Sequence, residues 1–338
     1  MKRGLLLGMS LTAVLVLAAC GNKGNSNTAE SSEKHYPVTI QNFKKAEGST
    51  VWGQKEQVFK KAPERILANT RPAAELLLHL GLGDKIVGVG ADFGAPDKTI
   101  EAEYAKLNIL SHGYVGKEVV LGTNPDLVYG RGGLFDNGDG YVGTVDSLNE
   151  MGVKTYVLES SVTGGTYDSI YKDIENLGRI FNVRAKAQSF IKELRDRQET
   201  ISSKLKVIKE KKTFAYLHMT DPNEVFVDAE GDDTFFNDAF NMVKLENIFK
   251  GTPGEVSVEM LIAADPDVLI IPNWETYDGS SPDKIKKALY ANPKLSSMKA
   301  IKNKQIYAVD YNYMFGYSYN TIDGMEILAK EMYPNLFN

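Results

Sequence analysis

One arrangement occurs twice in this chain and constrains its fold more than any other feature. A glutamate opens a short apolar segment, a Pro-Asp pair follows, and a run suited to a buried strand comes next. The copies are KEVVLGTNPDLVYG, where Glu118 stands seven positions before Pro125, and VEMLIAADPDVLII, where Glu259 stands seven positions before Pro266. Proline stops a helix, aspartate shapes a turn, and an apolar β-branched run fits a strand covered on both faces. The repeat predicts two similar α/β units.

Strand and helix patterns alternate around both copies of the repeat. In the first half, alternation predicts a hairpin from VTIQNF and STVWGQKEQVF, followed by the strand RILAN, a helix over 72–80 and the strand KIVGVG. In the second half, the strand candidates are TFAYLH, EVFVD, DVLII and QIYAVD. Strands that alternate with helices indicate a parallel sheet with helices on both faces.

A long helical segment separates the two halves. Residues 168–211 contain no proline and one glycine, Gly178. Apolar residues recur there at spacings of three and four, which predicts an amphipathic helix from Arg184 to Lys209, about 39 Å long at 1.5 Å per residue. A plain surface helix has the same pattern, but the position between two similar halves favours a strut that joins them.

Composition and charge exclude several classes of protein. A length of 338 residues suggests about two domains, and a net charge of -5 gives no reason to expect nucleic acid as a partner. Cys20 is the single cysteine, so the chain can form neither a disulfide framework nor a thiolate metal cluster. With four histidines, of which His35 falls in the predicted tether and His79 in a helix, we expect no bare metal site.

The N-terminus predicts export and a lipid anchor. Residues 1–20 read MKRGLLLGMSLTAVLVLAAC, with two basic residues, an apolar run too short to span a membrane comfortably, and small residues before Cys20. This is typical of a lipoprotein signal peptide, after which Cys20 would be the mature N-terminus and carry the lipid; an ordinary secretory signal or a short core segment is the alternative. Residues 21–35 are small and polar, as in a flexible tether. We therefore expect a protein on the outer face of the cell membrane.

The order of these segments resembles a known family. It runs from the cysteine through PERILANTRPAAELLLHLGLGDKIVGV, the first copy of the repeat, LGRIFNV and the long helix to VSVEMLIAADPDVLII. In this succession the chain resembles the substrate-binding proteins of ABC importers for iron chelates, haem and cobalamin. The resemblance implies an α/β fold of two Rossmann-like lobes joined by a single long helix. The expected boundaries are 36–167 for the N-terminal lobe, 168–211 for the helical segment and 212–338 for the C-terminal lobe.

The resemblance also implies a function and partners. It implies that the chain captures an iron chelate between its lobes, a ferric siderophore first and haem or a corrinoid as the alternative, and delivers it to a permease dimer with its ATPase subunits. The iron would travel inside the chelate, so we expect no intrinsic cofactor, no enzyme activity and a monomer. In that family a surface glutamate on each lobe pairs with an arginine of the membrane subunits, and the matching positions are Glu118 and Glu259. Acidic residues also favour first helical turns for structural reasons.

Candidate ligand-binding residues follow the predicted strands, because ligands of open parallel sheets collect beyond the carboxyl ends of the strands. In the first half these are Arg71, Asp92 and Arg131. Each arginine can fork onto the oxygens of an anionic chelate, or can instead be a surface or lobe-bracing residue. The last arginine of the chain is Arg197, so the second half offers none, which weakens the case for a highly charged ligand.

The second half contributes aromatic candidates and one histidine. The candidates are His218, Trp274, Tyr311, Tyr313 and Tyr317. The aromatic side chains offer stacking area for a large ligand, although tyrosines at alternating positions also line ordinary sheet edges. His218, with Met219 beside it, can ligate haem iron, whereas a histidine after a strand is often a hydrogen-bonded structural residue.

Two other classes of protein share part of this pattern. A metal-cluster redox enzyme can have the same two-lobed layout, but the missing cysteines argue against it. No Ser-His-Asp order, phosphate-binding glycine loop or carboxylate pair stands out in the sequence. An adhesive surface lipoprotein would need neither the paired glutamates nor the aromatic residues.

Overall fold

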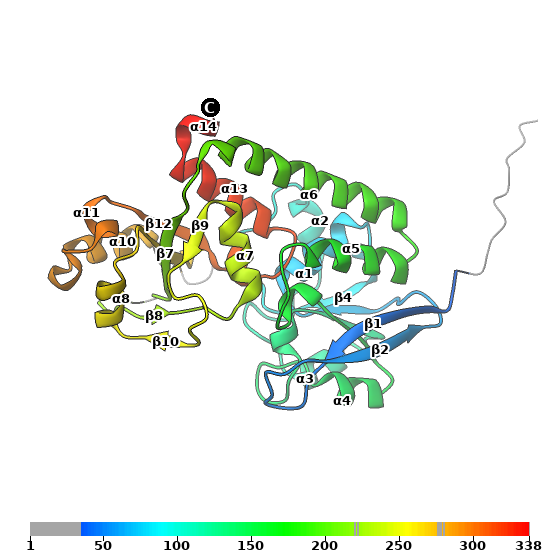
Figure 1. Cartoon of the computed structure of the whole chain (residues 1–338). Coiled ribbons are helices and arrows are strands. Elements are labelled where there is room, and N and C mark those ends of the chain that lie inside the picture. The colour runs from blue at the N-terminus through cyan, green and yellow to red at the C-terminus, as the bar shows by residue number, and fades with distance from the viewer. Residues whose placement is uncertain (1–34, 220, 222, 276–278, 280, 338) are drawn as a thin grey trace, which may run out of the picture. The chain divides into compact units, whose positions relative to one another are not determined.

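Each half of the chain builds its own β-sheet, as the repeat predicted (Figure 1). The computed structural model describes residues 35–338 except 220, 222, 276–278, 280 and 338. The signal peptide over residues 1–20 with Cys20, and residues 21–34 of the predicted tether, lie outside the described residues. Residues 36–338 pack as one unit.

The N-terminal lobe is built on a parallel sheet. Its strands are β3 (Ile66–Ala68), β4 (Ile86–Val89), β5 (Leu127–Gly130) and β6 (Lys154–Val157). They lie in the order β4-β3-β5-β6. The helices of this lobe are α1 (Arg71–His79), α2 (Glu101–Tyr104), α3 (Lys117–Gly122) and α4 (Val145–Glu150). Short 3-10 turns cover Gly83–Lys85, Gly132–Leu134 and Glu159–Ser161.

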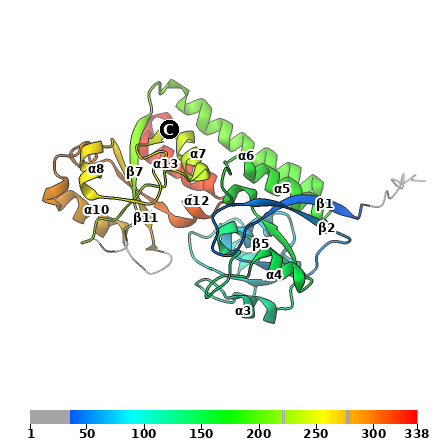
Figure 2. The ribbon, with the colours of Figure 1, turned by 60° about the horizontal axis from the view of Figure 1, so that its bottom comes forward.

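The predicted hairpin is confirmed. Strands β1 (Val38–Lys44) and β2 (Gly53–Phe59) pair antiparallel, with Val38 opposite Phe59. Alternate residues of β1 are buried, which is the pattern expected of a strand with one face on a core. The hairpin packs against β6 and against α5 (Ser169–Ile180), the helix that follows this lobe (Figure 2).

The C-terminal lobe has a mixed sheet in the order β10-β8-β7-β11-β12, and β9 also pairs with β7. The strands are β7 (Lys212–Leu217), β8 (Val227–Asp228), β9 (Leu245–Asn247), β10 (Glu255–Val256), β11 (Val268–Asn273) and β12 (Ile306–Asp310). Strand β8, which we expected in a parallel sheet, runs antiparallel to β7. Residues 218–226 are the whole connection between them, too short for the crossover that parallel strands need.

Helices cover this second sheet and close the chain. They are α7 (Thr234–Met242), α8 (Val258–Ala264), α10 (Pro282–Ala291), α11 (Lys299–Lys302), α12 (Tyr311–Phe315), α13 (Thr321–Met332) and α14 (Pro334–Phe337). A further 3-10 turn covers Pro293–Leu295. Of the tyrosines that we considered as edge residues of a sheet, Tyr311 and Tyr313 lie in helix α12, and Tyr317 follows that helix.

The predicted strut is α6 (Arg184–Lys204), which follows α5 (Ser169–Ile180). Its 21 residues make it roughly 31 Å long at 1.5 Å per residue. It ends earlier than Lys209 and passes into a 3-10 turn at Leu205–Val207, because Leu205 is buried and the residues after it are largely exposed. The helix packs on α5, α7 and α13, and Figure 1 shows it running along one side of the unit to β7.

A single hydrophobic core passes through both lobes. It includes Ile66 and Leu77 of the N-terminal lobe, Phe190 of α6, and Phe214 and Met325 of the C-terminal part. Each lobe also has a smaller core of its own. Because burial of apolar surface is the main stabilising term, a shared core restricts independent motion of the lobes.

The Pro-Asp pairs have the same structural role in both lobes. Each proline is preceded by a residue with left-handed backbone, φ 50° in the first copy and 48° in the second. The carboxylate of Asp126 accepts the N–H of Arg65 at 2.9 Å, and that of Asp267 accepts the N–H of Thr213 at 3.0 Å. Each aspartate therefore fixes the start of the neighbouring strand, β3 or β7. This accounts for the Pro-Asp part of the repeat but not for its glutamates.

Asp173 of α5 anchors the turn after β6 from inside the protein. It is 1% exposed and accepts the hydroxyl of Tyr156 at 2.8 Å, the N–H of Glu159 at 2.8 Å and the N–H of Ser160 at 3.1 Å. Burial raises the pKa of Asp173 to about 7, although these donors oppose the shift. The hydroxyl of Ser160 also donates to the carbonyl of Tyr317 at 2.7 Å, so the turn connects the two lobes.

We expect Asp173→Asn to lower the free energy of unfolding by about 2 kcal/mol at pH ~5.5, because the amide brings two N–H donors to a site where the protonated acid brings one. The folded pKa of Asp173 lies above its unfolded value, so the wild type loses stability as the pH rises through about 7, whereas asparagine does not titrate. The difference between wild type and variant should therefore shrink towards about pH 8.5 in urea unfolding. A difference that stays constant over this range would contradict the assignment.

Candidate functional site

The carboxyl ends of strands from the two lobes face one another. The N–H of Ala95, after β4, donates to Asp310 at the end of β12 at 2.9 Å. The side chain of Asn312 in α12 donates to the carbonyl of Phe93. Between them Gly94 has φ 93°, and a Cβ there would overlap the Asn312 side chain. A glycine is thus needed at this contact between the two lobes.

Arg131 follows β5 and is held by its backbone. Its N–H donates to Asn69 Oδ1 at 2.8 Å, and the Asn69 amide donates to its carbonyl at 3.0 Å. Gly130 makes this possible, since it has φ 139° and a Cβ would overlap Asn69. The guanidinium reaches across to the other lobe, where it lies 3.4 Å from the hydroxyl of Tyr311 and 5.1 Å from the ring centre of Tyr317.

The charge of Arg131 faces carboxyl groups of the C-terminal lobe. Burial works against this charge, but the phenol oxygens of Tyr311 and Tyr317 outweigh it and raise the pKa of Arg131. Burial, followed by the like charges of Asp228 and Asp233, raises the pKa of Glu230 to about 8, and Arg131 offsets this only in part. Carboxyl groups therefore outnumber cations on this surface between the lobes, and their charges together with burial keep Glu230 largely protonated at about pH 7.

Aromatic rings gather beside Arg131. Trp274 stacks on Tyr311 with ring centres 4.6 Å apart and planes 25° from parallel. His218 meets both edge-on, at 5.8 Å from Trp274 and 6.4 Å from Tyr311, and its ring nitrogen lies 3.1 Å from the hydroxyl of Tyr216. Phe93 of the N-terminal lobe lies 6.0 Å from Tyr311. The structure thus brings His218, Trp274 and Tyr311, which the sequence placed after three different strands, into one aromatic cluster.

Arg71 and Asp92 are paired with each other. The guanidinium of Arg71 makes an ion pair with Asp92, lies 3.5 Å from Glu75 and stacks 4.3 Å above the ring centre of Tyr104. The hydroxyl of Tyr104 donates to Asp92 at 2.8 Å, and His112 lies 3.2 Å from the same carboxylate. Two predicted ligand-binding residues therefore bind one another, and their role towards a ligand stays a prediction.

A cavity of about 370 Å³ lies between the lobes, and its lining includes Tyr317, over whose ring Arg131 lies. The N-terminal lobe contributes Lys45, Trp52 and Ser161 to it, and the C-terminal lobe contributes Glu230 and Tyr317 among others. Lys45 is held by Asp136 at 2.7 Å, so its charge does not offset the acidic side of the cavity.

Comparison with known proteins agrees with this architecture. Residues 66–313 match the family model described as periplasmic binding protein. The chain belongs to the periplasmic binding protein family. Over 342 residues it is 25% identical to the uncharacterized ABC transporter substrate-binding lipoprotein YvrC of Bacillus subtilis (strain 168), covering 99% of both chains. Over 209 residues it is 24% identical to a vitamin B12-binding protein of Vibrio parahaemolyticus, covering 61% of this chain and 70% of that one.

Solved structures of periplasmic binding proteins show the same fold. One from Veillonella parvula superposes with a TM-score of 0.76 at 23% identity, covering 88% of this chain and 99% of that chain. Within the described part of this periplasmic binding protein, no helix combines the length and apolar character needed to cross a bilayer. Nor do the described residues bring together three or more histidine, cysteine or carboxylate side chains suited to a metal ion.

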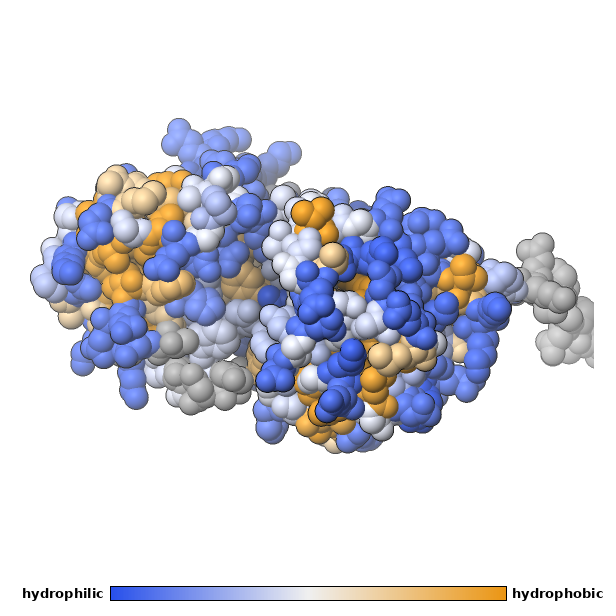
Figure 3. All heavy atoms as spheres, turned by 90° about the horizontal axis from the view of Figure 1, so that it is seen from below, coloured by the Kyte–Doolittle hydropathy of each residue, from blue (hydrophilic) through white to orange (hydrophobic). Residues whose placement is uncertain are grey.

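The paired glutamates of this periplasmic binding protein are exposed. Glu118 lies in the first turn of α3 and Glu259 in the first turn of α8. Each is followed by an exposed apolar residue, Val119 at 49% and Met260 at 50%. Figure 1 places α3 and α8 on its lower side, and Figure 3 views that side and shows apolar areas on both lobes within a largely hydrophilic surface.

Tyr313 lies apart from the aromatic cluster. Its side chain packs against Gly324 of α13, where a Cβ would overlap it, and it borders a different pocket. Tyr317 stays near Arg131 and donates its hydroxyl to Asp233 at 2.6 Å. Helix α12 ends at Phe315, between the two tyrosines, and Tyr317 has a left-handed backbone with φ 49°, so the two side chains point to different places.

Sequence reasoning missed the acidic residues of the site in this periplasmic binding protein. Glu230, Asp232 and Asp233 come from the stretch EGDD at 230–233, one residue after the predicted strand EVFVD. Three acids within four positions after a predicted strand could have indicated an acidic wall of the site. Phe93 carried no comparable signal, because its place in the cluster depends on contact between the lobes.

Proposed function

We propose that this protein is the extracellular solute-binding component of an ABC importer, and that it captures an iron chelate between its lobes. The observation that carries the proposal is the cluster of Trp274, Tyr311 and His218 beside the charged Arg131, at facing strand ends of two lobes. Aromatic faces suit the apolar parts of a chelate, and a guanidinium suits its oxygens. Membership of a binding-protein family supports capture and delivery rather than catalysis.

The charges favour one kind of chelate. Arg131 lies near Glu230 and Asp233, and Asp228 is close to Glu230. Arg71 is engaged with carboxylates of its own lobe. A strongly anionic chelate would be repelled by this surface. A ferric hydroxamate, in which three hydroxamate groups neutralise Fe(III), meets less repulsion than a ferric catecholate. A ferric hydroxamate siderophore is therefore our first candidate, and haem or a corrinoid is the second, in line with the name of the Vibrio relative.

Native mass spectrometry of the full chain released from detergent tests this proposal. The panel contains a ferric hydroxamate, a ferric catecholate, haem and cobalamin. We expect a one-to-one complex with the hydroxamate. A complex with haem or cobalamin alone would replace the first candidate by the second, and the absence of any complex would contradict a binding function for these ligands.

The proposal also covers the bounds of the lobes, the oligomeric state, the docking surface and the absence of an intrinsic cofactor. The lobes would be residues 36–167 and 212–338, joined by the helical segment 168–211, and the chain would act as a monomer. Glu118 and Glu259 would face a permease dimer, whose two-fold symmetry suits one carboxylate on each of two similar lobes. The iron would belong to the chelate, so the protein itself would hold no cofactor.

The protein is proposed to be anchored by lipid on Cys20 at the outer face of the cell membrane, as the name of the Bacillus relative suggests. We expect Cys20→Ser to release the protein from membranes without unfolding it, because residues 36–338 form a unit of their own. Fractionation followed by a salt wash measures the release, and far-ultraviolet circular dichroism measures the folding. A variant that stays on the membrane after the wash would show that Cys20 is not the anchor.

A further inference from the structure

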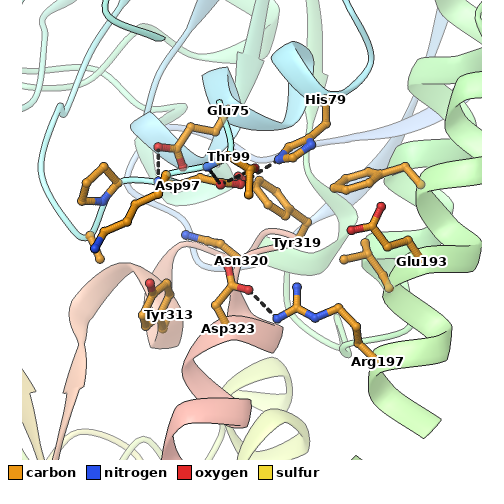
Figure 4. A pocket seen from close by; sticks show the side chains of 15 residues that line it. Glu75, His79, Asp97, Thr99, Glu193, Arg197, Tyr313, Tyr319, Asn320 and Asp323 are labelled. Atoms are coloured by element: carbon orange, nitrogen blue, oxygen red, sulfur yellow. Dashed lines mark hydrogen bonds and ion pairs between the residues drawn. The ribbon is translucent and has the colours of Figure 1, made fainter. Parts of the chain in front are cut away.

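A second pocket lies where α1 and α6 meet the end of α12 and the start of α13 (Figure 4). Its volume is about 270 Å³, compared with about 30 Å³ for one water molecule in the liquid. We call it the junction pocket, defined here by Glu75, Asp97, Tyr313, Asn320 and Asp323. None of the aromatic-cluster residues lines it, so a ligand here would be independent of chelate capture.

One carboxylate of the junction pocket is fully engaged. Asp97 lies 2.8 Å from His79 Nε2, and it accepts the hydroxyls of Tyr319 at 2.8 Å and Thr99 at 2.6 Å. Burial opposes its ionisation, but these hydrogen bonds prevail and hold the pKa of Asp97 well below its usual range. Asp97 is therefore a fixed negative charge with little capacity to spare.

Two other side chains are buried without sufficient partners. Glu75 is 1% exposed; its Oε1 accepts the N–H of Asp97 at 3.2 Å, but its Oε2 has no hydrogen bond to the described protein atoms. Asn320 is 2% exposed, and neither its amide oxygen nor its amide nitrogen has a partner there. Figure 4 shows the Asn320 amide lying between Asp97 and Asp323. A buried polar group without a hydrogen bond is costly, so a pocket with such groups favours a polar occupant.

The charges around the pocket favour a cation. Arg71, the cation nearest Glu75, is shared with Asp92, and burial raises the pKa of Glu75 to about 7. Arg197 is likewise engaged by two carboxylates, Asp323 at 2.6 Å and Glu326 at 2.8 Å. Two permanent cations line the pocket, Arg197 and the exposed Lys98, against four carboxylates: Glu75, Asp97, Glu193 and Asp323. A buried carboxylate of this kind is stabilised by a cation that also donates hydrogen bonds.

We propose that the junction pocket binds a small primary ammonium cation. Its N–H groups would donate to Glu75 Oε2 and to the amide oxygen of Asn320, with the hydroxyl of Tyr313 as a further acceptor at the pocket wall. The volume leaves room for a short organic chain on the nitrogen. Since Glu75 comes from the N-terminal lobe and Asn320 from the C-terminal part, the cation would tie the lobes together.

Thermal unfolding of the full chain in detergent, in chloride salts of equal ionic strength, tests this site. The salts are ammonium, ethylammonium, sodium, potassium and tetramethylammonium, the last of which has no N–H donor. We expect ammonium and ethylammonium at about ten times their dissociation constants to raise the melting temperature by about 3 °C over tetramethylammonium. Sodium and potassium distinguish a requirement for N–H donors from a requirement for charge alone.

Asn320→Leu is expected to abolish the difference between ammonium and tetramethylammonium, because it removes the amide oxygen while keeping the size of the side chain. Asn303→Leu, at an exposed asparagine that does not line the pocket, should keep it and is the matched control. Glu75→Gln should also abolish the difference and serves if Asn320→Leu does not fold. Equal melting temperatures of the wild type in all five salts, or an equal rise with sodium and potassium, would overturn the proposal.

Discussion

Reversing Glu118 and Glu259 to lysine together is expected to abolish uptake through the importer while leaving chelate affinity unchanged. Both side chains are exposed, each in the first turn of its helix, α3 or α8. Neither makes an ion pair with another residue in the described part of the chain, so both are available to a partner. An exposed ion pair is worth about 0–1 kcal/mol, but opposite charges at a docking surface also govern association and register. Reversal turns two attractive contacts into two repulsive ones.

Transport of radioactive iron chelate into cells, together with the dissociation constant of the purified variant, measures this effect. The matched control is Glu101→Lys with Glu246→Lys, which changes the charge equally at one exposed acid in each lobe. The control should transport at the wild-type rate. Normal uptake by the Glu118/Glu259 variant, or an equal loss of chelate affinity, would refute the docking role of the paired glutamates.

Arg131→Ala is expected to weaken chelate binding about 10- to 100-fold, the effect of losing one hydrogen-bonded charge of about 1.5–3 kcal/mol. Asn69 holds the backbone at this position through the N–H and the carbonyl, which alanine retains, so the loop should keep its conformation. Calorimetric titration measures the affinity. An unchanged dissociation constant would move the site away from Arg131.

Arg71→Ala should act differently, although the sequence made the two arginines look equivalent. Arg71 neutralises Asp92 and lies against Glu75, so its loss leaves buried carboxylates without a cation. We expect the free energy of unfolding to fall by about 2–4 kcal/mol, seen in urea unfolding. Loss of chelate affinity without loss of stability would show that Arg71 binds the ligand directly.

Local patterns of the sequence predicted much of the fold. The Pro-Asp repeat identified two related lobes, because proline and aspartate act through nearby backbone atoms. The apolar stripe identified α6, and the alternation identified the β1-β2 hairpin. The direction of β8 was not evident from its composition; it follows from the short connection after β7. The end of α6 depended on where its buried face stops.

The candidate site was less predictable because it forms between distant segments. Strand ends identified Arg131, Trp274 and Tyr311, which the structure brings together. The pairing of Arg71 with Asp92 was not evident, because each residue alone resembles a ligand contact. The direction of a side chain that follows a strand depends on the next helix or loop. Burial of that side chain by the opposite lobe leaves no pattern in the neighbouring sequence.

The most direct test of chelate capture is the fluorescence of Trp274. The chain has two tryptophans, so Trp52→Phe leaves Trp274 as the one indole, stacked on Tyr311 in the aromatic cluster. We predict that a ferric hydroxamate quenches this emission saturably, at the stoichiometry found by mass spectrometry. Trp274→Phe, which retains Trp52, should be quenched less. Unchanged Trp274 emission at concentrations where mass spectrometry detects the complex would contradict the proposal that the chelate binds at this cluster.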